Sequence, residues 1–331
     1  MISVKRIGGF WGTWVFSWLL LPGLTFPVSP APPFPIPRIA NSPPDKKESK
    51  PPKESANWPD PVEAKFVQVF PSTNPGSAFL RTPGQTRAIV LVHGFHLIPF
   101  RKGYANQAVF HSWQNPESKL VELLARQGDI YAFAYSQNVA VEEIAGVPCL
   151  AENIRNLKKL DYAQIILLGH SAGGLIARQF IEDYPDIGVT KVIQVCSPNG
   201  GTTFAQCDPA VSKFQKGFLH SLTKESRGQS MKDRAKKNIP ESVQFACVVG
   251  DGGGIGDGLV SIDSQWPVDL QKQGIPAVFL HTTHFTVMRS QAEAQHLAEL
   301  VRTNTPRWNP TQVSQAKKEK VGKKGEIPWS R

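Results

Sequence analysis

The sequence predicts an α/β fold in which a mostly parallel sheet is flanked by helices. Three observations support this class. Six short apolar runs suit buried strands, helical patterns separate most of them, and no internal repeat is present. Strands that alternate with helices favour a parallel sheet covered on both faces. With 331 residues and 40% hydrophobic positions, the chain has material for one sizeable core. The predicted strands are residues 88–92, 130–134, 165–168, 192–196, 243–249 and 277–280.

Four segments carry apolar residues at helical spacing, as in Leu150, Ile154 and Leu157. The first of these segments also has a proline near its start, which suits a helix N-terminus. The predicted helices are residues 116–126, 142–160, 172–184 and 290–302. Together with the strands they place one domain at residues 62–302.

The first 30 residues are predicted to be a signal peptide or an N-terminal membrane anchor. Lys5 and Arg6 precede an apolar run at residues 7–21, and small residues follow it. This run is shorter than the ~20 residues that span a bilayer, which favours cleavage, although apolar residues beyond Pro22 could extend it. In either case the protein is expected to be exported, as a secreted, periplasmic or membrane-anchored protein.

Residues 31–61 form a Pro-rich linker, and residues 303–331 are predicted to be a basic disordered tail. Most of the formal charge of +10 lies outside the folded body, whose own charges nearly balance. The body is therefore not a nucleic-acid-binding module, and we expect no nucleic acid partner. A second hypothesis for the tail, or for the N-terminal segment, is association with an anionic membrane surface.

The strongest chemical signal is the segment Gly169-His170-Ser171-Ala172-Gly173, which lies between a predicted strand and a predicted helix. This G-x-S-x-G pattern is typical of a sharp turn that lifts a nucleophilic serine clear of the sheet. The flanking glycines are expected because side chains there would collide with the turn. The helix N-terminus adds free N–H groups and a positive dipole beside Ser171.

A nucleophilic serine needs a base, and His284 is the preferred candidate among eight histidines. It lies in the loop after the last predicted strand, where His281 is the alternative. We expect the side chain of His170 to point away from the serine, and His296 to be an ordinary helix residue. An acid should follow the preceding strand and hold the imidazole. Asp251 and Asp257 both lie in that glycine-rich loop.

Four segments resemble those of lipase/esterase-type α/β-hydrolases, over residues 88–302. Leu91-Val92-His93-Gly94-Phe95 resembles the loop that supplies an oxyanion donor, and the Ser171 segment resembles the nucleophile elbow. Residues 197–202 resemble a Gly-Thr-ending loop, although Asn199 stands where many relatives have His. Residues 256–261 are similar to the stretch that carries the acid, which favours Asp257 over Asp251.

The resemblance implies a serine hydrolase that cleaves carboxylic esters of a lipid-like kind through an acyl-enzyme. In this reading Ser171, Asp257 and His284 form the triad, and the N–H groups of Phe95 and Ala172 form the oxyanion hole. The expected partner is a small-molecule or lipid ester, without a cofactor. An acyltransferase of the same fold and a non-catalytic binding module on this scaffold are the alternatives.

Residues 202–239 are too long for a plain connection between strands and are interpreted as a cap over the site, with a surface insertion that has no role in substrate binding as the alternative. Phe204 and other aromatic residues among its lysines would suit an acyl chain or an anionic lipid. The segment 96–113 is the other expected pocket wall. The four cysteines allow a disulfide between Cys196 and Cys207 in an exported protein. No cysteine and histidine spacing resembles a zinc site, so no metal is expected.

Overall fold

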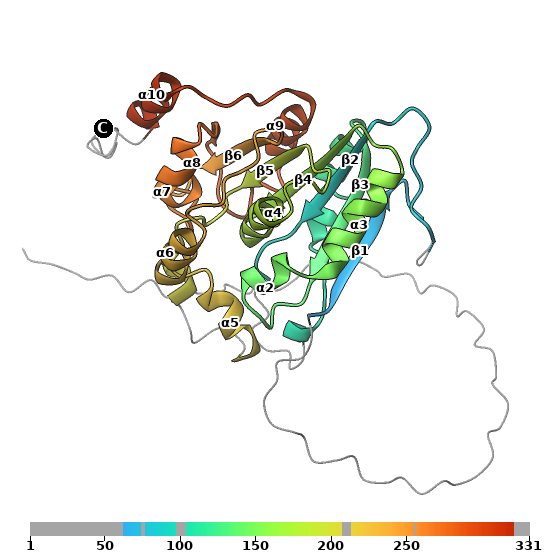
Figure 1. Ribbon diagram of the computed structural model, residues 1–331, viewed down its shortest axis with the longest axis horizontal. Helices are drawn as coiled ribbons and strands as arrows, with labels where there is room; N and C mark the ends of the chain where they lie inside the picture. The colour runs from blue at the N-terminus through green and yellow to red at the C-terminus, as the bar shows by residue number, and fades with distance from the viewer. Residues whose placement is uncertain (1–61, 74–76, 97–103, 207–212, 255, 321–331) are drawn as a thin grey trace, which may run out of the picture. The chain divides into compact units, whose positions relative to one another are not determined.

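A seven-stranded sheet is the centre of the computed structural model, which describes residues 62–73, 77–96, 104–206, 213–254 and 256–320 (Figure 1). The strand order is β1-β3-β2-β4-β5-β6-β7, and every neighbouring pair is parallel except β1 with β3. The strands are β1 Ala64–Phe70, β2 Arg87–Val92, β3 Asp129–Tyr135, β4 Gln164–His170, β5 Lys191–Val195, β6 Gln244–Gly250 and β7 Ala277–Leu280.

The six predicted strands are confirmed, and all of them except the edge strand β7 are buried on both faces, because helices cover both sides of the sheet. The segment that forms β1 was not among the strands predicted from apolar runs. This strand lies at the edge of the sheet, and only Gln68 and Val69 in it are buried. A half-exposed edge strand has no continuous apolar run, so the signal that found the central strands is absent there.

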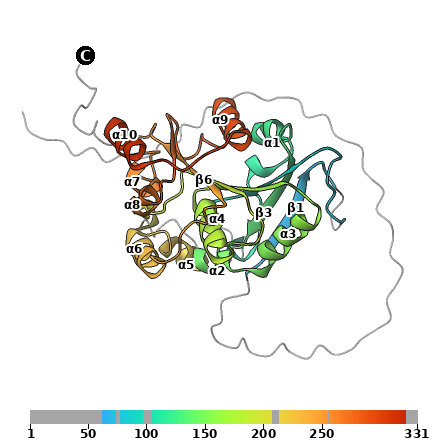
Figure 2. The ribbon, with the colours of Figure 1, turned by 45° about the horizontal axis from the view of Figure 1, so that its top comes forward.

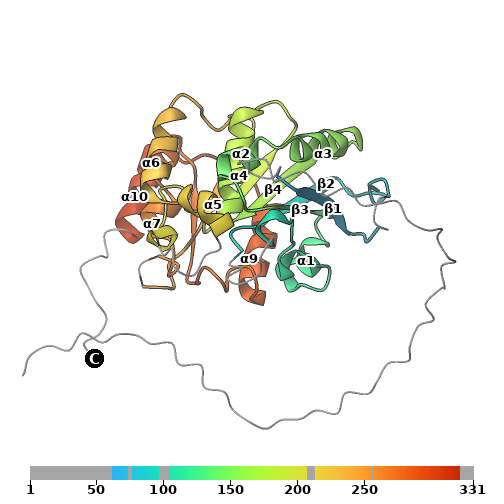
Figure 3. The same cartoon turned by 90° about the horizontal axis from the view of Figure 1, so that it is seen from below.

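Helices lie on the two faces of the sheet (Figure 3). Helices α2, α3 and α4 cover one face, and α1 packs against α9 on the other. Two hydrophobic clusters fill the two interfaces. These helices are α1 Lys119–Leu124, α2 Val141–Ala145, α3 Pro148–Lys159, α4 Ala172–Asp183 and α9 Gln291–Arg302.

The helix expected at residues 142–160 is two helices. Helix α2 ends at its C-cap Gly146, and α3 begins at Pro148 after the extended residue Val147. Proline has no N–H and its ring clashes with the preceding turn, so it starts a helix more readily than it continues one. The apolar spacing continues across this break, which explains why the pattern alone predicted one element.

The insertion at residues 202–239 lies between β5 and β6, as expected. Its helix α6 Lys224–Asp233 and the next residue, Arg234, are held against α2 and α4 by partly buried ion pairs. Arg227 bonds to Glu142 at 2.6 Å, and Arg234 bonds to Glu182 at 3.0 Å. The short helix α5 Lys216–His220 contributes Phe218 to the core instead of to the surface.

The prediction of a disordered tail from residue 303 is wrong for residues 303–320. Trp308 donates its N–H to the Gly274 carbonyl at 2.6 Å, and its ring lies 5.9 Å from that of Trp266. Arg307 bonds to the carbonyls of Gln273 and Ile239. These contacts bring helix α10 Pro310–Lys320 beside α7 Ile262–Gln265 and α8 Val268–Lys272 (Figure 2). The composition of the tail predicted disorder, but the contacts of Arg307 and Trp308 hold this segment on the folded body.

The predictions for the N-terminal segment and linker, residues 1–61, lie outside the described residues, as does the end of the tail at residues 321–331. Within the described ranges, no helix combines the length and the apolar character that crossing a membrane requires.

Candidate active site

Ser171 lies at a strained turn between β4 and α4. Its φ of 54° and ψ of −125° are unusual for a residue other than glycine. A Cβ at Gly169 would lie 2.6 Å from the Gly173 carbonyl oxygen, and one at Gly173 would lie 2.3 Å from the His93 carbonyl oxygen. Close backbone approach therefore requires both glycines: Gly169 lies against the turn itself, and Gly173 lies against the end of β2.

The loop after β2 passes directly beside the serine. A Cβ on Gly94 would lie 2.6 Å from the Ser171 Cβ and 3.2 Å from its Oγ. Phe95, the next residue, lines the same pocket as Ser171. Ala172 is the first residue of α4, so its N–H has no acceptor within the helix. Phe95 and Ala172, the two expected oxyanion donors, therefore both lie close to Ser171.

His284 and Asp257 form a buried pair. His284 Nδ1 lies 2.7 Å from Asp257 Oδ2, and the side chain of Asp257 is inaccessible to solvent. Its other oxygen, Oδ1, accepts from the N–H groups of Leu259 at 2.9 Å and Val260 at 2.7 Å. Burial alone would raise the pKa of Asp257, but the bond to His284 and these N–H groups outweigh it and lower the pKa. A charged carboxylate is thereby held against the imidazole.

The other acid and the other histidine pair with each other at the surface. Asp251 Oδ1 lies 3.3 Å from His281 Nδ1, and the His281 side chain is 88% exposed. Neither residue lines the pocket of Ser171. The arrangement separates the two alternatives that the sequence left open. Asp257 and His284 accompany the serine, and Asp251 and His281 do not.

His170 differs from the expectation that its side chain points away. Its Nε2 lies 3.0 Å from the His284 carbonyl oxygen, and its ring lines the same pocket as Ser171. Burial lowers the pKa of His170 to about 3, so the ring is neutral and Nε2–H donates to the carbonyl. His170 therefore supports the backbone of His284, the expected base. His296, by contrast, is an exposed residue of α9, as predicted.

The pocket around Ser171 has a volume of about 270 Å³ and two unlike walls. One wall is apolar and includes Phe204 and Leu222 from the insertion, while the lysines of the insertion do not line it. A second part of the lining comes from rings of the segment 96–113, as expected, and from His170. These rings are His96, His111 and Trp113, and those of His96 and His111 stack at 3.7 Å.

His93 is a buried residue behind this wall that the sequence did not assign. Its ring stacks on Tyr135 at 4.2 Å, and burial lowers its pKa to about 3. Its Nδ1 lies 2.8 Å from the Gly94 carbonyl oxygen. His93 therefore supports the loop that carries Phe95. The His-Gly motif places His93 in this loop but does not by itself indicate this role.

Cys196 is a free thiol, which corrects the possible disulfide with Cys207 that the sequence allows. Its side chain is buried at the end of β5, and its φ is 53°. The thiol contacts Asp257, and burial with this carboxylate raises the thiol pKa. Its Sγ and the facing atoms of Asp257 and His284 lie within 4.8 Å of one another, a set that could ligate a metal. The carboxylate and the imidazole are, however, already bonded to each other. Cys207 itself lies outside the described residues.

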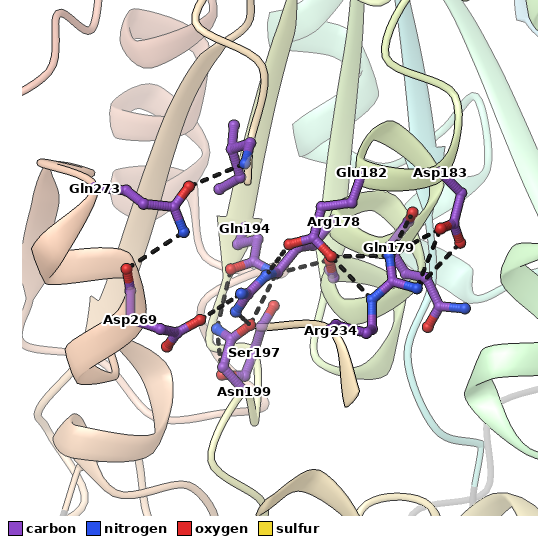
Figure 4. Close-up of polar contacts among 12 residues, drawn as sticks. Arg178, Gln179, Glu182, Asp183, Gln194, Ser197, Asn199, Arg234, Asp269 and Gln273 are labelled. Atoms are coloured by element: carbon purple, nitrogen blue, oxygen red, sulfur yellow. Dashed lines mark hydrogen bonds and ion pairs between the residues drawn. The ribbon is translucent and has the colours of Figure 1, made fainter. Parts of the chain in front are cut away.

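Figure 4 shows a network of ion pairs around Arg178 of α4. This network borders a larger cavity of about 610 Å³. Arg178 of α4 bonds to Glu182 at 2.8 Å, to Asn199 at 3.2 Å and to Asp269. The guanidinium groups that line this cavity are bonded to carboxylates. Ser171 and His284 do not line this cavity, and both line the smaller pocket.

Comparisons with known proteins support the fold. No protein-family model matches the sequence, and no curated protein is significantly similar to it. The mature lipase BlEst2 of Bacillus licheniformis superposes with a TM-score of 0.51 and 16% identity, over 74% of this chain and 99% of that one. The phospholipase PlaB of Legionella pneumophila gives a TM-score of 0.51 and 15% identity, over 72% of this chain and 63% of its own.

At these identities the comparisons establish architecture alone. Together with the strand order and the flanking helices, they show that the chain has the α/β-hydrolase fold, as the sequence predicted.

Proposed function

We propose that this protein is a serine hydrolase that cleaves carboxylic esters, with Ser171 as nucleophile, His284 as base and Asp257 as the acid that orients it. The observation that carries the proposal is the buried His284–Asp257 pair, whose imidazole lines the pocket of Ser171. The three residues follow β4, β6 and β7, so they meet at the carboxyl edge of one parallel sheet.

In the proposed reaction, Ser171 Oγ attacks the ester carbonyl carbon while His284 Nε2 takes the hydroxyl proton. Asp257 holds Nδ1–H and stabilises the imidazolium that forms. His284 then gives the proton to the leaving alcohol, which leaves an acyl-enzyme. Water attacks this ester with His284 again as base, releasing the acid and restoring Ser171.

The tetrahedral oxyanion would be held by the N–H groups of Phe95 and Ala172. The close approach of Gly94 to Ser171 and the start of α4 at Ala172 support this assignment. Such a donor contributes about 3 kcal/mol to stabilising the transition state.

The substrate is proposed to be lipid-like. The wall formed by Phe204, Leu222 and Val260 suits an acyl chain, and Phe285, 60% exposed, extends the apolar surface to the rim. Apolar pockets with a few polar groups are typical of such ligand sites. The exposed lysines of the insertion lie away from the pocket, so the acyl chain is favoured over an anionic group as the part that the insertion contacts.

The test is labelling of the purified protein with a fluorophosphonate probe, followed by hydrolysis of p-nitrophenyl esters of increasing acyl length. Ser171→Ala is expected to lose labelling and to lower kcat by at least 10³-fold, because no other group replaces the nucleophile. Circular dichroism and Tm of the variant serve as the control for folding.

Equal labelling of the parent and Ser171→Ala would contradict the assignment of the nucleophile. No labelling of a folded parent would favour a binding module on this scaffold. If the parent is labelled but transfers the acyl group to an added alcohol in preference to water, an acyltransferase is the better description.

A further inference from the structure

We propose that Gln265 is a positioning residue that holds the loop carrying Asp257, and through it the Asp257–His284 pair. This inference rests on the proposed function, because it assigns Gln265 to the same site. Gln265 is the last residue of α7, is 1% exposed, and does not line the pocket.

The loop that carries Asp257 has little intrinsic order. Six of the nine residues from 250 to 258 are glycine. Glycine loses more backbone freedom on folding than any other residue, and ordering a residue costs about 1–2 kcal/mol. A loop of this composition needs contacts from outside to keep a carboxylate in one place.

The Gln265 amide ties the two ends of this loop together. Its Oε1 accepts from the Gly250 N–H at 2.8 Å, and its Nε2 donates to the Gly250 carbonyl at 3.0 Å. The same Nε2 donates to the Val260 carbonyl at 2.9 Å. Gly250 ends β6 and Val260 lies just before α7, so one side chain closes the loop at its base.

Val260 passes this constraint to the acid. Its carbonyl accepts from Gln265, and its N–H donates to Asp257 Oδ1 at 2.7 Å. The opposite oxygen of the same carboxylate bonds to His284 Nδ1 at 2.7 Å. The Asp257 carbonyl also accepts from the His284 N–H at 2.9 Å. A continuous series of hydrogen bonds therefore runs from Gln265 through Val260 and Asp257 to His284.

Gln265 can bear this role because its own backbone is anchored. Its carbonyl accepts from Asn199 Nδ2 at 3.0 Å. Asn199 in turn bonds to Gln194 and to Arg178 of α4, as Figure 4 shows. The loop of the acid is thus fixed to the helix that begins beside Ser171. This contact also explains what Asn199 does at the position where many relatives of the resembled family have His.

The experiment compares Gln265→Met with Gln68→Met in the full chain. Methionine keeps the length of the side chain and removes its hydrogen bonds. Gln68 is a matched control, because it is also buried and ties a loop by bonds to both polar groups of the Leu80 backbone, but on the edge strand β1. Both variants are expected to lower Tm.

Gln265→Met alone is expected to lower kcat at least tenfold with little change in KM, as is found when partners that orient catalytic groups are removed. It should also weaken the far-downfield proton NMR resonance of His284 Nδ1–H, which reports the bond to Asp257. Gln68→Met should retain both kcat and the resonance.

Parental kcat and resonance in Gln265→Met, despite a lower Tm, would reduce Gln265 to a structural residue and overturn the proposal. If Gln265→Met does not fold, Gln265→Asn is measured instead, since it retains an amide that is one methylene too short to reach both ends. Failure of both variants to fold would also overturn a specific positioning role. If the parent hydrolyses no ester, the proposed function fails, and the resonance still decides whether Gln265 positions the pair.

Discussion

The two acids of the glycine-rich loop, six residues apart, lie in different environments. Asp257 is buried, accepts two backbone N–H groups and bonds to His284, whereas Asp251 faces His281 and Lys320 at the surface. A buried carboxylate must be satisfied in this way to remain charged. An exposed pair contributes little to stability or to positioning.

Asp257→Asn is therefore expected to lower kcat/KM for a p-nitrophenyl ester by about 10³ to 10⁴-fold, because an amide cannot hold the imidazole in the reactive tautomer. Asp251→Asn is the matched control and should stay within about twofold of the parent. A larger loss in Asp251→Asn than in Asp257→Asn would reverse the assignment of the acid.

At the scale of elements, helix α10 and the segment before it are part of the folded body. Thr303 accepts a bond from the buried Lys191, Thr305 bonds to Gln244, and Trp308 packs on Trp266. Burial disfavours the charged ammonium group of Lys191 and lowers its pKa to about 8. The carbonyls that accept hydrogen bonds from this group compensate for its burial and so stabilise this region.

Truncation after Arg302 is expected to lower Tm by roughly 10 °C, since several buried hydrogen bonds at about 1 kcal/mol each are lost, together with the packing of Trp308. Truncation after Lys320 removes other basic residues but none of these contacts, and is the control. Thermal denaturation followed by circular dichroism measures both. Equal Tm values for the two truncations would show that α10 contributes nothing to the body.

At the scale of the whole molecule, the buried histidines make stability depend on pH. The pKa values of His93 and His170 are lowered from 6.5 to about 3 by burial. Between these values the unfolded chain binds protons that the folded chain does not. The free energy of unfolding that these two neutral histidines contribute is therefore complete above pH 6.5. It is lost as the pH falls toward 3, by about 1.4 kcal/mol per pH unit for each histidine.

Urea denaturation between pH 7 and pH 5 tests this dependence. His93→Gln is expected to make the free energy of unfolding fall less steeply with pH than it does in the parent. His296→Gln, at an exposed position of α9, should leave the slope unchanged. An unchanged slope in His93→Gln would mean that His93 is protonated in the folded protein or does not titrate in this range.

The sequence by itself determined the central strands, most of the helices on the two faces and the turn that presents Ser171. These features depend on local patterns: apolar runs, helical spacing and glycines beside a serine. The edge strand β1 and the break at Pro148 were missed, since the same patterns are weak or continuous there. The composition of residues 303–320 also predicted disorder wrongly, because the order of this segment depends on contacts with distant residues.

Only the tertiary structure decided which groups meet. It paired Asp257 with His284 and Asp251 with His281, turned His170 into the pocket, left Cys196 a free thiol, and placed Gln265 across the base of the acid loop. Each of these outcomes depends on distances between segments that the chain separates. Local propensity carries no information about such distances, because they are set by how strands and helices pack into one body.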